Sequence, residues 1–271
     1  MDTSDLASRM KGFEHKNRIY LEKKCPTILR LDGKSFHTFT KGFIKPFDLI
    51  MMESMWEASK FLCANIQGCK LAYTQSDEIS LLITDYEKEN SDAWFDYNIQ
   101  KMVSVAASMA TLEFNKSFSN KVWDFQNSGI DTNYEKFIDE DIEKQSKIYK
   151  NKINTAMFDA RAFNLPKDEV NNYFYWRESD ALRNSIQMVA QANFSHKELQ
   201  NLNCNQLQEK LFQDKNLNWN NLPTIQKCGA CIIKENYYIE TENGQVLRTK
   251  WEVDKNIPIF SQDKNYIEKF I

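Results

Sequence analysis

Two short apolar runs that enclose a polar tetrad constrain the fold of this chain more than any other feature. The runs are Lys70–Tyr73 and Ile79–Ile83, and Gln75-Ser76-Asp77-Glu78 lies between them. Strand-length apolar segments separated by a few polar residues are typical of a β-hairpin. The sequence therefore predicts a hairpin that carries two carboxylates, Asp77 and Glu78, at its turn.

Another carboxylate follows a strand pattern upstream of this hairpin. Pro26–Leu31 alternates in hydrophobicity as a strand does, and Asp32-Gly33 then signals a turn. The next segment, from Asp48 to about Gln67, is rich in Met, Leu, Ala and Trp at helical spacing, with Asp48 near its N-cap. An order of strand, helix and hairpin allows Asp32 and the hairpin carboxylates to converge on one edge of a sheet.

The rest of the chain alternates between helical and strand patterns, so the fold class that we predict is α/β (α+β). Helical patterns cover Tyr97 to about Phe114, Asp168 to about Gln191 after Pro166, a short segment with the capping box Ser195-x-x-Glu198, and Cys204–Phe212. Strands are expected at Met157–Phe163, Thr224–Lys234, Tyr237–Thr241 and Val246–Val253.

Composition limits the classes of function. The 271 residues are 42% hydrophobic, enough for a substantial core, and only 7 are Gly, which argues against a Gly-rich phosphate loop. The formal net charge of −3 is a poor signature for nucleic-acid binding, but a local basic groove can coexist with an acidic total. No apolar run approaches the roughly 20 residues of a membrane-spanning helix.

The cysteines and the N-terminal segment indicate a reducing compartment. The polar, acidic start of the chain favours neither a secretion signal nor an Arg-rich transit peptide. We therefore expect free, mostly buried thiols and a cytoplasmic location, with a mitochondrial one left open. Cys228-x-x-Cys231 has the spacing of half a zinc site, but the chain has only three His and no second Cys pair with such spacing.

The carboxylates suit phosphoryl transfer by two metal ions. Mg²⁺ prefers oxygen ligands and keeps open positions for substrate phosphates. Two ions about 4 Å apart stabilise the attacking and the leaving oxygens together. After Asp32, Gly33 allows the backbone to approach a ligand, and the amides that follow can bind triphosphate oxygens. An ordinary Asp-Gly turn and a polar hairpin tip are the alternative interpretation of the same residues.

Several motifs in order resemble the tRNA-His guanylyltransferase family. They are Arg30-Leu-Asp-Gly-Lys-Ser-Phe-His-Thr-Phe-Thr40, Lys45-Pro-Phe-Asp48, Ala72-Tyr-Thr-Gln-Ser-Asp-Glu-Ile-Ser80, Trp94-Phe-Asp-Tyr-Asn-Ile-Gln-Lys-Met-Val-Ser104, Phe158-Asp-Ala-Arg161 and Tyr175-Trp-Arg-Glu-Ser-Asp-Ala-Leu-Arg-Asn184. The resemblance extends from about Arg9 to Lys234. It implies a nucleotidyltransferase with a polymerase palm-like antiparallel sheet, flanking helices and a helical, RNA-facing C-terminal part, which synthesises in the 3′-to-5′ direction.

The resemblance also implies roles for individual residues. The catalytic residues would be Asp32, Asp77 and Glu78, and two Mg²⁺ ions would be held by Asp32, Asp77 and the Gly33 carbonyl. The implied nucleotide-binding positions are Asp32, Gly33, Lys34, Ser35, Phe36, His37, Lys45, Ser76, Asp77 and Lys101. RNA would contact Arg177, Arg183 and Asn184, for which a solvated helix face with ion pairs to Glu178 and Asp180 is the alternative.

The implied partners are tRNA, ATP and GTP or other nucleoside triphosphates, and further copies of the chain in a homotetramer, with no membrane. Members that guanylate tRNA-His carry a His-Ile-Asn-Asn segment after the Trp-Arg motif, whereas this chain has Leu182-Arg183-Asn184-Ser185. This pattern is similar to the guanylyltransferase-like branch, which is associated with template-dependent repair of 5′-truncated tRNAs.

The expected reaction has two steps. ATP first activates the 5′ phosphate of the RNA, and the 3′-hydroxyl of an incoming nucleotide then attacks the activated phosphate. In repair, the incoming base is chosen by pairing with the opposite strand. Alternatives are addition of G at position −1 of tRNA-His, a nucleotide cyclase, and a non-catalytic RNA-binding protein.

We predict one domain built from three stretches. Residues 1–135 form the palm-like catalytic region with the metal carboxylates. Residues 136–154 form an exposed insertion or loop, because the stretch Asp131–Asn154 is crowded with Lys, Asp, Glu and Asn. Residues 155–271 complete the same domain with the long helix and the C-terminal strands.

Overall fold

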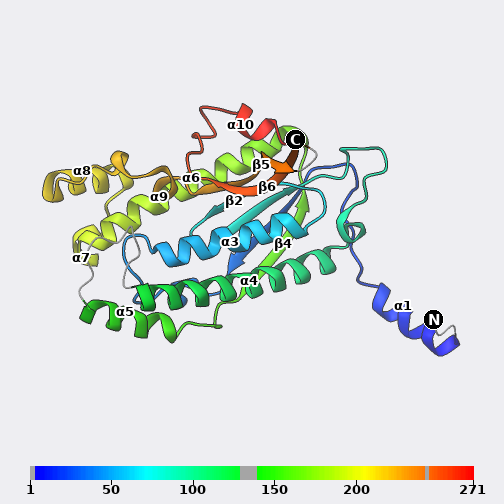
Figure 1. Ribbon diagram of the computed structural model, residues 1–271, viewed down its shortest axis with the longest axis horizontal. Helices are drawn as coiled ribbons and strands as arrows, with labels where there is room; N and C mark the ends of the chain where they lie inside the picture. The colour runs from blue at the N-terminus through cyan, green and yellow to red at the C-terminus, as the bar shows by residue number, and fades with distance from the viewer. Residues whose placement is uncertain (1–3, 129–138, 242–243) are drawn as a thin grey trace.

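An antiparallel sheet lies at the centre of the computed structural model, which describes residues 4–128, 139–241 and 244–271 (Figure 1). The order of its strands is β4-β1-β3-β2-β5-β6, and every neighbouring pair is antiparallel. The strands are β1 (Thr27–Gly33), β2 (Cys69–Gln75), β3 (Glu78–Ile83), β4 (Phe158–Asn164), β5 (Ala230–Thr241) and β6 (Gly244–Asp254). With helices on both faces, this confirms the predicted α/β fold.

Three long helices cover the sheet. They are α3 (Leu49–Asn65) and α4 (Ile99–Ser128) on one face and α6 (Lys167–Asn193) on the other (Figure 1). The shorter helices are α1 (Asp5–His15), α2 (Phe36–Phe39), α5 (Asp139–Lys150), α7 (His196–Leu199), α8 (Cys204–Lys215), α9 (Thr224–Lys227) and α10 (Asn265–Glu268), with 3₁₀ turns η1 (Trp94–Tyr97) and η2 (Trp219–Asn221). In the described ranges, no helix is long and apolar enough to cross a membrane.

Alternation along β1 divides its side chains between two cores. Leu29 and Leu31 pack against α3 and α4, whereas Ile28 packs with Phe174 of α6 in the opposite core. Successive strand residues point to opposite faces. Asp32, four residues after Ile28, therefore lies on the α6 face at the end of the strand.

Most of the predicted elements are confirmed. The first strand, the hairpin, the strand after Met157 and the long helix after Pro166 all form. Asp48 is the N-cap of α3, and its Oδ1 accepts the Met51 N–H at 3.0 Å. Ser195 and Glu198 form the predicted capping box. The six cysteines are free thiols, and four of them are buried.

The predicted C-terminal strands need correction. Thr224–Lys227 is helix α9 rather than the start of a strand, and it follows Pro223 as its N-cap residue. The predicted strands Thr224–Lys234 and Tyr237–Thr241 are replaced by the single strand β5. The polar residues between them stay in the strand because they pair with β6, where Glu235 lies opposite Lys250.

The stretch 136–154, predicted as an exposed insertion or loop, is not a simple loop where the structure describes it, although most of its described side chains are exposed or half-buried. Residues 136–138 lie outside the described residues, but the rest of the stretch begins with helix α5. Tyr149 is fully buried, and its hydroxyl donates to Asp48 Oδ2 at 2.5 Å. Gln145 Nε2 donates to the Gly42 carbonyl at 3.2 Å. The charged residues hide an apolar face with which α5 packs against α4 and the loop before α3.

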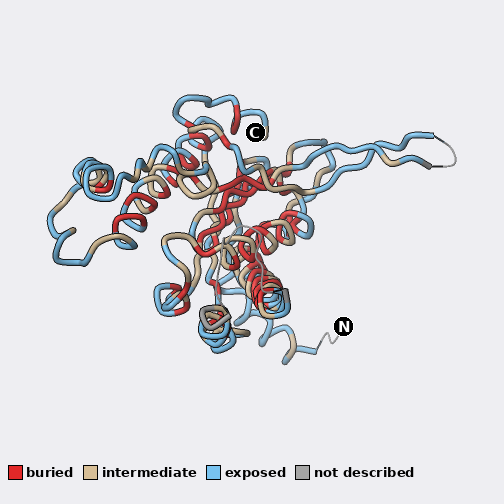
Figure 2. Tube along the Cα trace, turned by 60° about the vertical axis from the view of Figure 1, so that its left-hand side comes forward, coloured by how far each residue is buried: buried red, intermediate tan, exposed pale blue. Residues whose placement is uncertain are grey.

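Two segments extend away from this body. The outer part of the β5–β6 ribbon projects as an arm that is exposed along its length (Figure 2). Helix α1 has no buried residue and lies apart from the sheet near the N-terminus (Figure 1). Neither segment contributes to the end of the sheet where β1 finishes.

Candidate active site

The turn between β2 and β3 brings Asp77 to the end of β1. Asp32 lies opposite Glu78 in the β1–β3 ladder, and the Gly33 N–H donates to the Asp77 carbonyl at 3.0 Å. Ser76 adopts a left-handed φ of 50°, and its hydroxyl donates to Asp77 Oδ1 at 3.0 Å. The structure thus places Asp32 and Asp77 together at one end of the sheet.

The two aspartates form a half-buried anionic pair. Burial raises the pKa of Asp77, and the charge of Asp32 raises it further, whereas the Ser76 hydroxyl lowers it. A nearby like charge disfavours the ionised form of a carboxyl group, and a cation reverses that effect. The site therefore fits a divalent ion with oxygen ligands, for which Asp32, Asp77 and the Gly33 carbonyl are the available donors.

Asp159 is a further carboxylate beside Asp32, and the sequence did not identify it as a site residue. Asp159 of β4 lies opposite Asp32, and its Oδ1 accepts a hydrogen bond from Arg161 at 3.1 Å. Arg161 is itself opposite Arg30. The motif Phe158-Asp-Ala-Arg161 was visible in the sequence, but only the strand register shows that it borders Asp32.

A cavity of about 720 Å³ opens beside Asp77. Its walls are the loop after β1, the segment before α3, the β2–β3 turn, and residues of α6 and α9. The volume lies within the range of about 300–1,000 Å³ that is usual for small-molecule sites. Since Asp77 stands at its wall, the cavity has both the size and the position for a nucleotide.

Most of the predicted nucleotide-binding residues line this cavity. They are Gly33, Ser35, Phe36, His37, Lys45, Ser76 and Asp77. Lys34 is exposed in the same loop, and its N–H donates to the Met157 carbonyl at 2.8 Å. The Phe36 ring belongs to the core, where its centroid lies 5.1 Å from that of Phe158.

Glycine is required at position 33 by this packing. A Cβ atom there would lie 2.3 Å from Cδ2 of the Phe36 ring. Real Cβ atoms do not approach a ring so closely, and the ring is fixed by the aromatic core around it. The loop after Asp32 can therefore fold over Phe36 only without a side chain at Gly33.

Lys101 does not join the other predicted nucleotide-binding residues. It is exposed at the start of α4, with its Nζ 5.9 Å from the Phe95 ring centroid. Thr111 lies ten residues after Lys101 on the same helix, a distance of about 15 Å at the usual rise per residue. Its Oγ1 accepts the Phe158 N–H at 3.1 Å. Phe158 lies opposite Gly33, so Lys101 is at the far end of β1 from Asp32.

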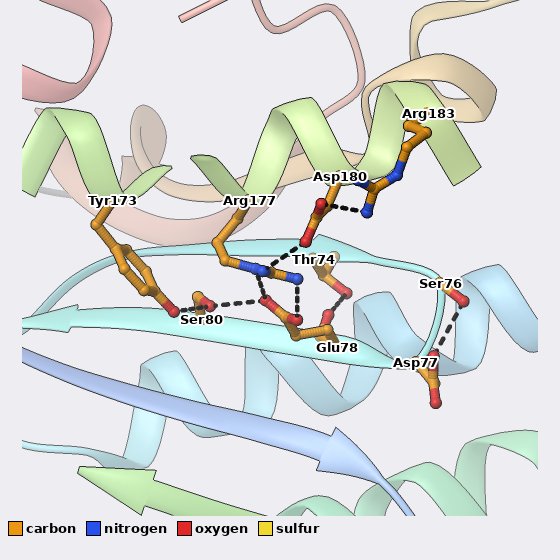
Figure 3. A network of polar contacts seen from close by, with 9 residues as sticks. All are labelled: Thr74, Ser76, Asp77, Glu78, Ser80, Tyr173, Arg177, Asp180 and Arg183. Atoms are coloured by element: carbon orange, nitrogen blue, oxygen red, sulfur yellow. Dashed lines mark hydrogen bonds and ion pairs between the residues drawn. The ribbon is translucent and has the colours of Figure 1, made fainter. Parts of the chain in front are cut away.

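Glu78 and Arg177 bind each other instead of taking separate roles (Figure 3). Arg177 Nε and Nη2 donate to the two Glu78 carboxylate oxygens at 2.8 and 2.7 Å. Both residues are buried, with 7% and 6% of their surfaces exposed. The predicted RNA contact of Arg177 needs correction, since this side chain has little exposed surface to offer to RNA. The predicted catalytic role of Glu78 stays a prediction, with its carboxylate engaged by Arg177 on the face that it shares with Asp32.

Asp180 links this pair to the surface. Its Oδ2 accepts Arg177 Nη1 at 2.8 Å, and its Oδ1 accepts Arg183 Nη2 at 2.6 Å. Arg183 is exposed and Asn184 lines the cavity, so these two predicted RNA contacts remain accessible. Of the ion pairs in the alternative interpretation, those of Arg177 and Arg183 with Asp180 form, whereas Glu178 is bonded elsewhere.

Glu178 is instead buried on the other side of α6. Its Oε2 accepts the Phe260 N–H at 2.8 Å, and burial raises its pKa to about 7. Its neighbour Cys228 is a buried free thiol just before β5, and Cys231 lies opposite Tyr73. The described part of the chain contains no group of three or more His, Cys, Asp or Glu that could hold a metal, so a zinc site at these cysteines gains no support.

The wall of the cavity that α6 and α9 contribute was largely missed. Besides Asn184, it contains Met188, Gln191, Gln226 and Lys227. Nothing local in the sequence marks these residues, because they meet the rest of the cavity only through the packing of α9 on α6.

Comparison with known proteins places these features in context. A family model described as "Thg1: tRNAHis guanylyltransferase" matches residues 7–166. A solved structure titled "Bacterial tRNA(HIS) Guanylyltransferase (Thg1)-Like Protein in complex with ATP" is 46% identical, covers 98% of both chains and has a TM-score of 0.82. The corresponding structure in complex with GTP is 43% identical, covers 98% of this chain and 99% of its own, and has a TM-score of 0.77. The tRNA(His) guanylyltransferase of Debaryomyces hansenii is 26% identical over 263 residues, which are 91% of this chain and 86% of that protein.

Proposed function

Because the chain belongs to the tRNAHis guanylyltransferase family of nucleotidyltransferases, we propose that it adds nucleotides to the 5′ end of tRNA, each chosen by pairing with the opposite strand. The observation that carries the proposal is the pair Asp32 and Asp77 at one end of the sheet, of which Asp77 lines a nucleotide-sized cavity. ATP and GTP, which the similar bacterial proteins bind, are the substrates that we propose for this cavity.

Asp32, Asp77 and the Gly33 carbonyl would hold two Mg²⁺ ions in this mechanism. Bound there, the ions would acidify the attacking 3′-hydroxyl and neutralise charge on the phosphates. The chain itself orients the donors. Ser76 holds one oxygen of Asp77, and the bond from the Gly33 N–H to the Asp77 carbonyl keeps the two turns in register.

The loop after β1 would bind the triphosphate through its backbone. The Lys34 N–H is bonded to Met157, so the amides that we assign to phosphate are those of Ser35, Phe36 and His37. Lys41, Lys45 and Lys227 line the same cavity and supply positive charge. This local basic character answers the objection that the whole chain is acidic.

The proposal of templated repair, rather than fixed addition of G, rests on the segment around Leu182. Leu182 stands where the tRNA-His guanylating members carry His, and it is half-buried against the core between α6 and the sheet. It therefore offers no polar group to a particular nucleotide. Arg183 and Asn184 are the adjacent accessible groups, and we propose that they contact the tRNA. A homotetramer, as the resemblance implies, is part of the same proposal.

The test offers the protein a 5′-truncated tRNA transcript with Mg²⁺ and labelled nucleoside triphosphates. We expect extension by the nucleotide complementary to the opposing base. Asp32→Ala or Asp77→Ala should lower the rate at least about 10³-fold, since a bound metal contributes several kcal/mol to transition-state stabilisation.

Two control reactions separate the alternatives. Addition of G to full-length tRNA-His at the same rate whatever base lies opposite would favour guanylation at position −1. A cyclic nucleotide formed without RNA would favour a cyclase. Extension that survives both Ala substitutions would remove the metal assignment.

A further inference from the structure

A buried ion pair joins the β2–β3 turn to helix α6 (Figure 3). Arg177 binds both oxygens of Glu78 and, through Nη1, also Asp180. Burying two charges costs several kcal/mol per ion, so a buried pair is a weak source of net stability. A pair that contributes little net stability and lies beside the candidate active site suggests a role in geometry.

The position of Glu78 links the ion pair to the placement of Asp77 relative to Asp32. Glu78 directly follows Asp77 and lies opposite Asp32 in the ladder, so it sits between the two aspartates in the backbone network. Its own carbonyl accepts the Thr74 hydroxyl at 2.9 Å, which closes the turn from the other strand. Figure 3 shows Asp77 at the tip of this turn, pointing away from Arg177. Any tilt of the turn would move Asp77 relative to Asp32.

The guanidinium of Arg177 is itself held on several sides. Its Cζ lies 4.4 Å from the centre of the Trp176 ring, and Asp180 fixes the end that Glu78 leaves free. The Ser80 hydroxyl, at the next position on the same face of β3, lies 3.3 Å from Glu78 Oε1 and 2.7 Å from the Tyr173 hydroxyl. The carboxylate of Glu78 thus has one orientation, set from α6.

We propose that Arg177 is a positioning residue which acts through Glu78 to keep Asp77 beside Asp32. The inference rests on the proposed role of the two aspartates and deepens it. Arg177 touches neither aspartate. It fixes the strand residue next to Asp77 by a two-point contact that only the planar fork of arginine can make.

Helix α6 carries a second arginine, Arg183, on the same network of ion pairs. Substitutions of Arg183 and of Arg177 should therefore affect different kinetic constants. Arg183, bonded to Asp180, is the exposed end, with 58% of its side chain accessible. Loss of Arg183 should weaken binding of tRNA. Loss of Arg177 should instead disturb the metal ligands, and so lower kcat and the affinity for the metal while leaving KM for tRNA nearly unchanged.

The experiment compares Arg177→Gln, Arg177→Lys and Glu78→Gln with the wild type and with Lys121→Gln. The control removes an ion pair between Lys121 and Glu53 that has the same 2.7 Å length and joins α4 to α3. Two quantities are measured for each protein, namely Mn²⁺ affinity in a titration without RNA and the rate of templated addition at varied tRNA concentration.

We expect Arg177→Gln and Glu78→Gln to lower kcat by about 10²-fold, the usual consequence of a misplacement of about 1 Å. Mn²⁺ affinity should fall about tenfold, and KM for tRNA should stay within about twofold. Arg177→Lys, which keeps the charge but not the fork, should lie between. The double variant Glu78→Gln/Arg177→Gln should be no worse than either single one, because both remove the same contact.

Wild-type Mn²⁺ affinity and kcat in a folded Arg177→Gln protein would overturn the inference, as would a loss confined to KM for tRNA. If Arg177→Gln does not fold, Arg177→Lys decides, and equality with the wild type in both measurements rejects the role. The variant Asp77→Ala distinguishes a failure of the proposed metal ligands from a failure of the positioning role of Arg177. If it retains activity, the metal assignment on which the proposed mechanism depends fails, and if it is inactive while the Arg177 variants are normal, only the positioning role fails.

Discussion

The sheet contains two hairpins with the same antiparallel pairing and opposite surroundings. All residues of β3 are buried, and β2 is covered on both faces by α3 and α6. The outer part of the β5–β6 ribbon is exposed on both faces, with the successive residues Tyr237 and Tyr238 at 38% and 67% of their full accessibility (Figure 2). Both hairpins are antiparallel ladders, with a register shift between Cys69 and Leu71 in the first. Their difference in exposure lies in what packs on them.

This contrast explains why the candidate active site is at the first hairpin. A two-stranded ribbon without packing is marginally stable, whereas a buried one opens only with the rest of the fold. Carboxylates that hold metal ions need fixed positions. Asp77 has such a position because its turn is bonded to Gly33 and its neighbour Glu78 is bonded to α6. Among the described residues of the outer ribbon, no comparable bond to a helix is found.

Amide hydrogen exchange should show the largest difference between the two hairpins. The amides of Ile79–Ile83 should exchange only by global unfolding, and those of Tyr237–Ile239 by local opening. We expect protection to differ by about 5 kcal/mol, because global stability is typically about 5–15 kcal/mol and local opening of exposed elements costs little. Residue-resolved exchange measured by NMR gives both values. Equal protection in the two hairpins would show that the ribbon is stabilised by contacts that the structure lacks.

A matched pair of leucines sharpens the comparison at the level of side chains. Leu82 in β3 has no exposed surface, whereas Leu247 in β6 is half-exposed. Leu82→Ala should lower the free energy of unfolding by about 2–5 kcal/mol, and Leu247→Ala by no more than about 0.5 kcal/mol. Urea denaturation measures both. A large loss at Leu247 would mean that the ribbon tip packs against something, such as another copy of the chain.

The first hairpin was predictable from the sequence and much of its surroundings was not. Alternating apolar residues around Gln75–Glu78 are a local signal, and so is the strand that ends at Asp32. The partner of Glu78 is 99 residues away, so no local pattern identifies it. In the sequence Arg177 reads as one more charge on a polar helix face. Only the packing of α6 on the sheet shows that it is buried.

The strands of the second hairpin were themselves hard to predict from the sequence. Its sequence lacks clear alternation because neither face is buried, so the strand was divided at Glu235 and Asn236. Helix α9 was missed for a related reason. A single turn of helix after Pro223 has too few residues to show a helical period, and the apolar residues Ile232 and Ile233 nearby favoured a strand throughout. Strands and helices can be predicted from hydrophobic periodicity where one face is buried. The short helix α9, which forms part of the cavity wall, has no such periodicity.

The smallest expected effect is on the pH dependence of the free energy of unfolding. It concerns the junction of the two hairpins, where β2 pairs with β5 and Glu178 of α6 is buried. Burial raises the pKa of Glu178 from 4.5 to about 7. A raised pKa in the folded state means that the stabilising, protonated form is complete below about pH 4.5 and is lost as the pH rises towards about 7. The facing Cys228 thiol, with its pKa raised by burial to about 11, stays neutral over this range, as does Tyr73, whose pKa burial also raises.

Glu178→Gln should therefore make the protein more stable by about 2 kcal/mol at pH 8, since each pKa unit corresponds to about 1.4 kcal/mol and part of the shift is offset by the unpaired amide nitrogen. At pH 5 the two proteins should differ little, because Glu178 is then mostly protonated. Urea denaturation at both pH values measures the effect, with Glu169→Gln at the exposed start of the same helix as the control. An equal change at both pH values would show that Glu178 contributes through packing and hydrogen bonding alone, and that the junction between the buried and the exposed hairpin carries no titrating group.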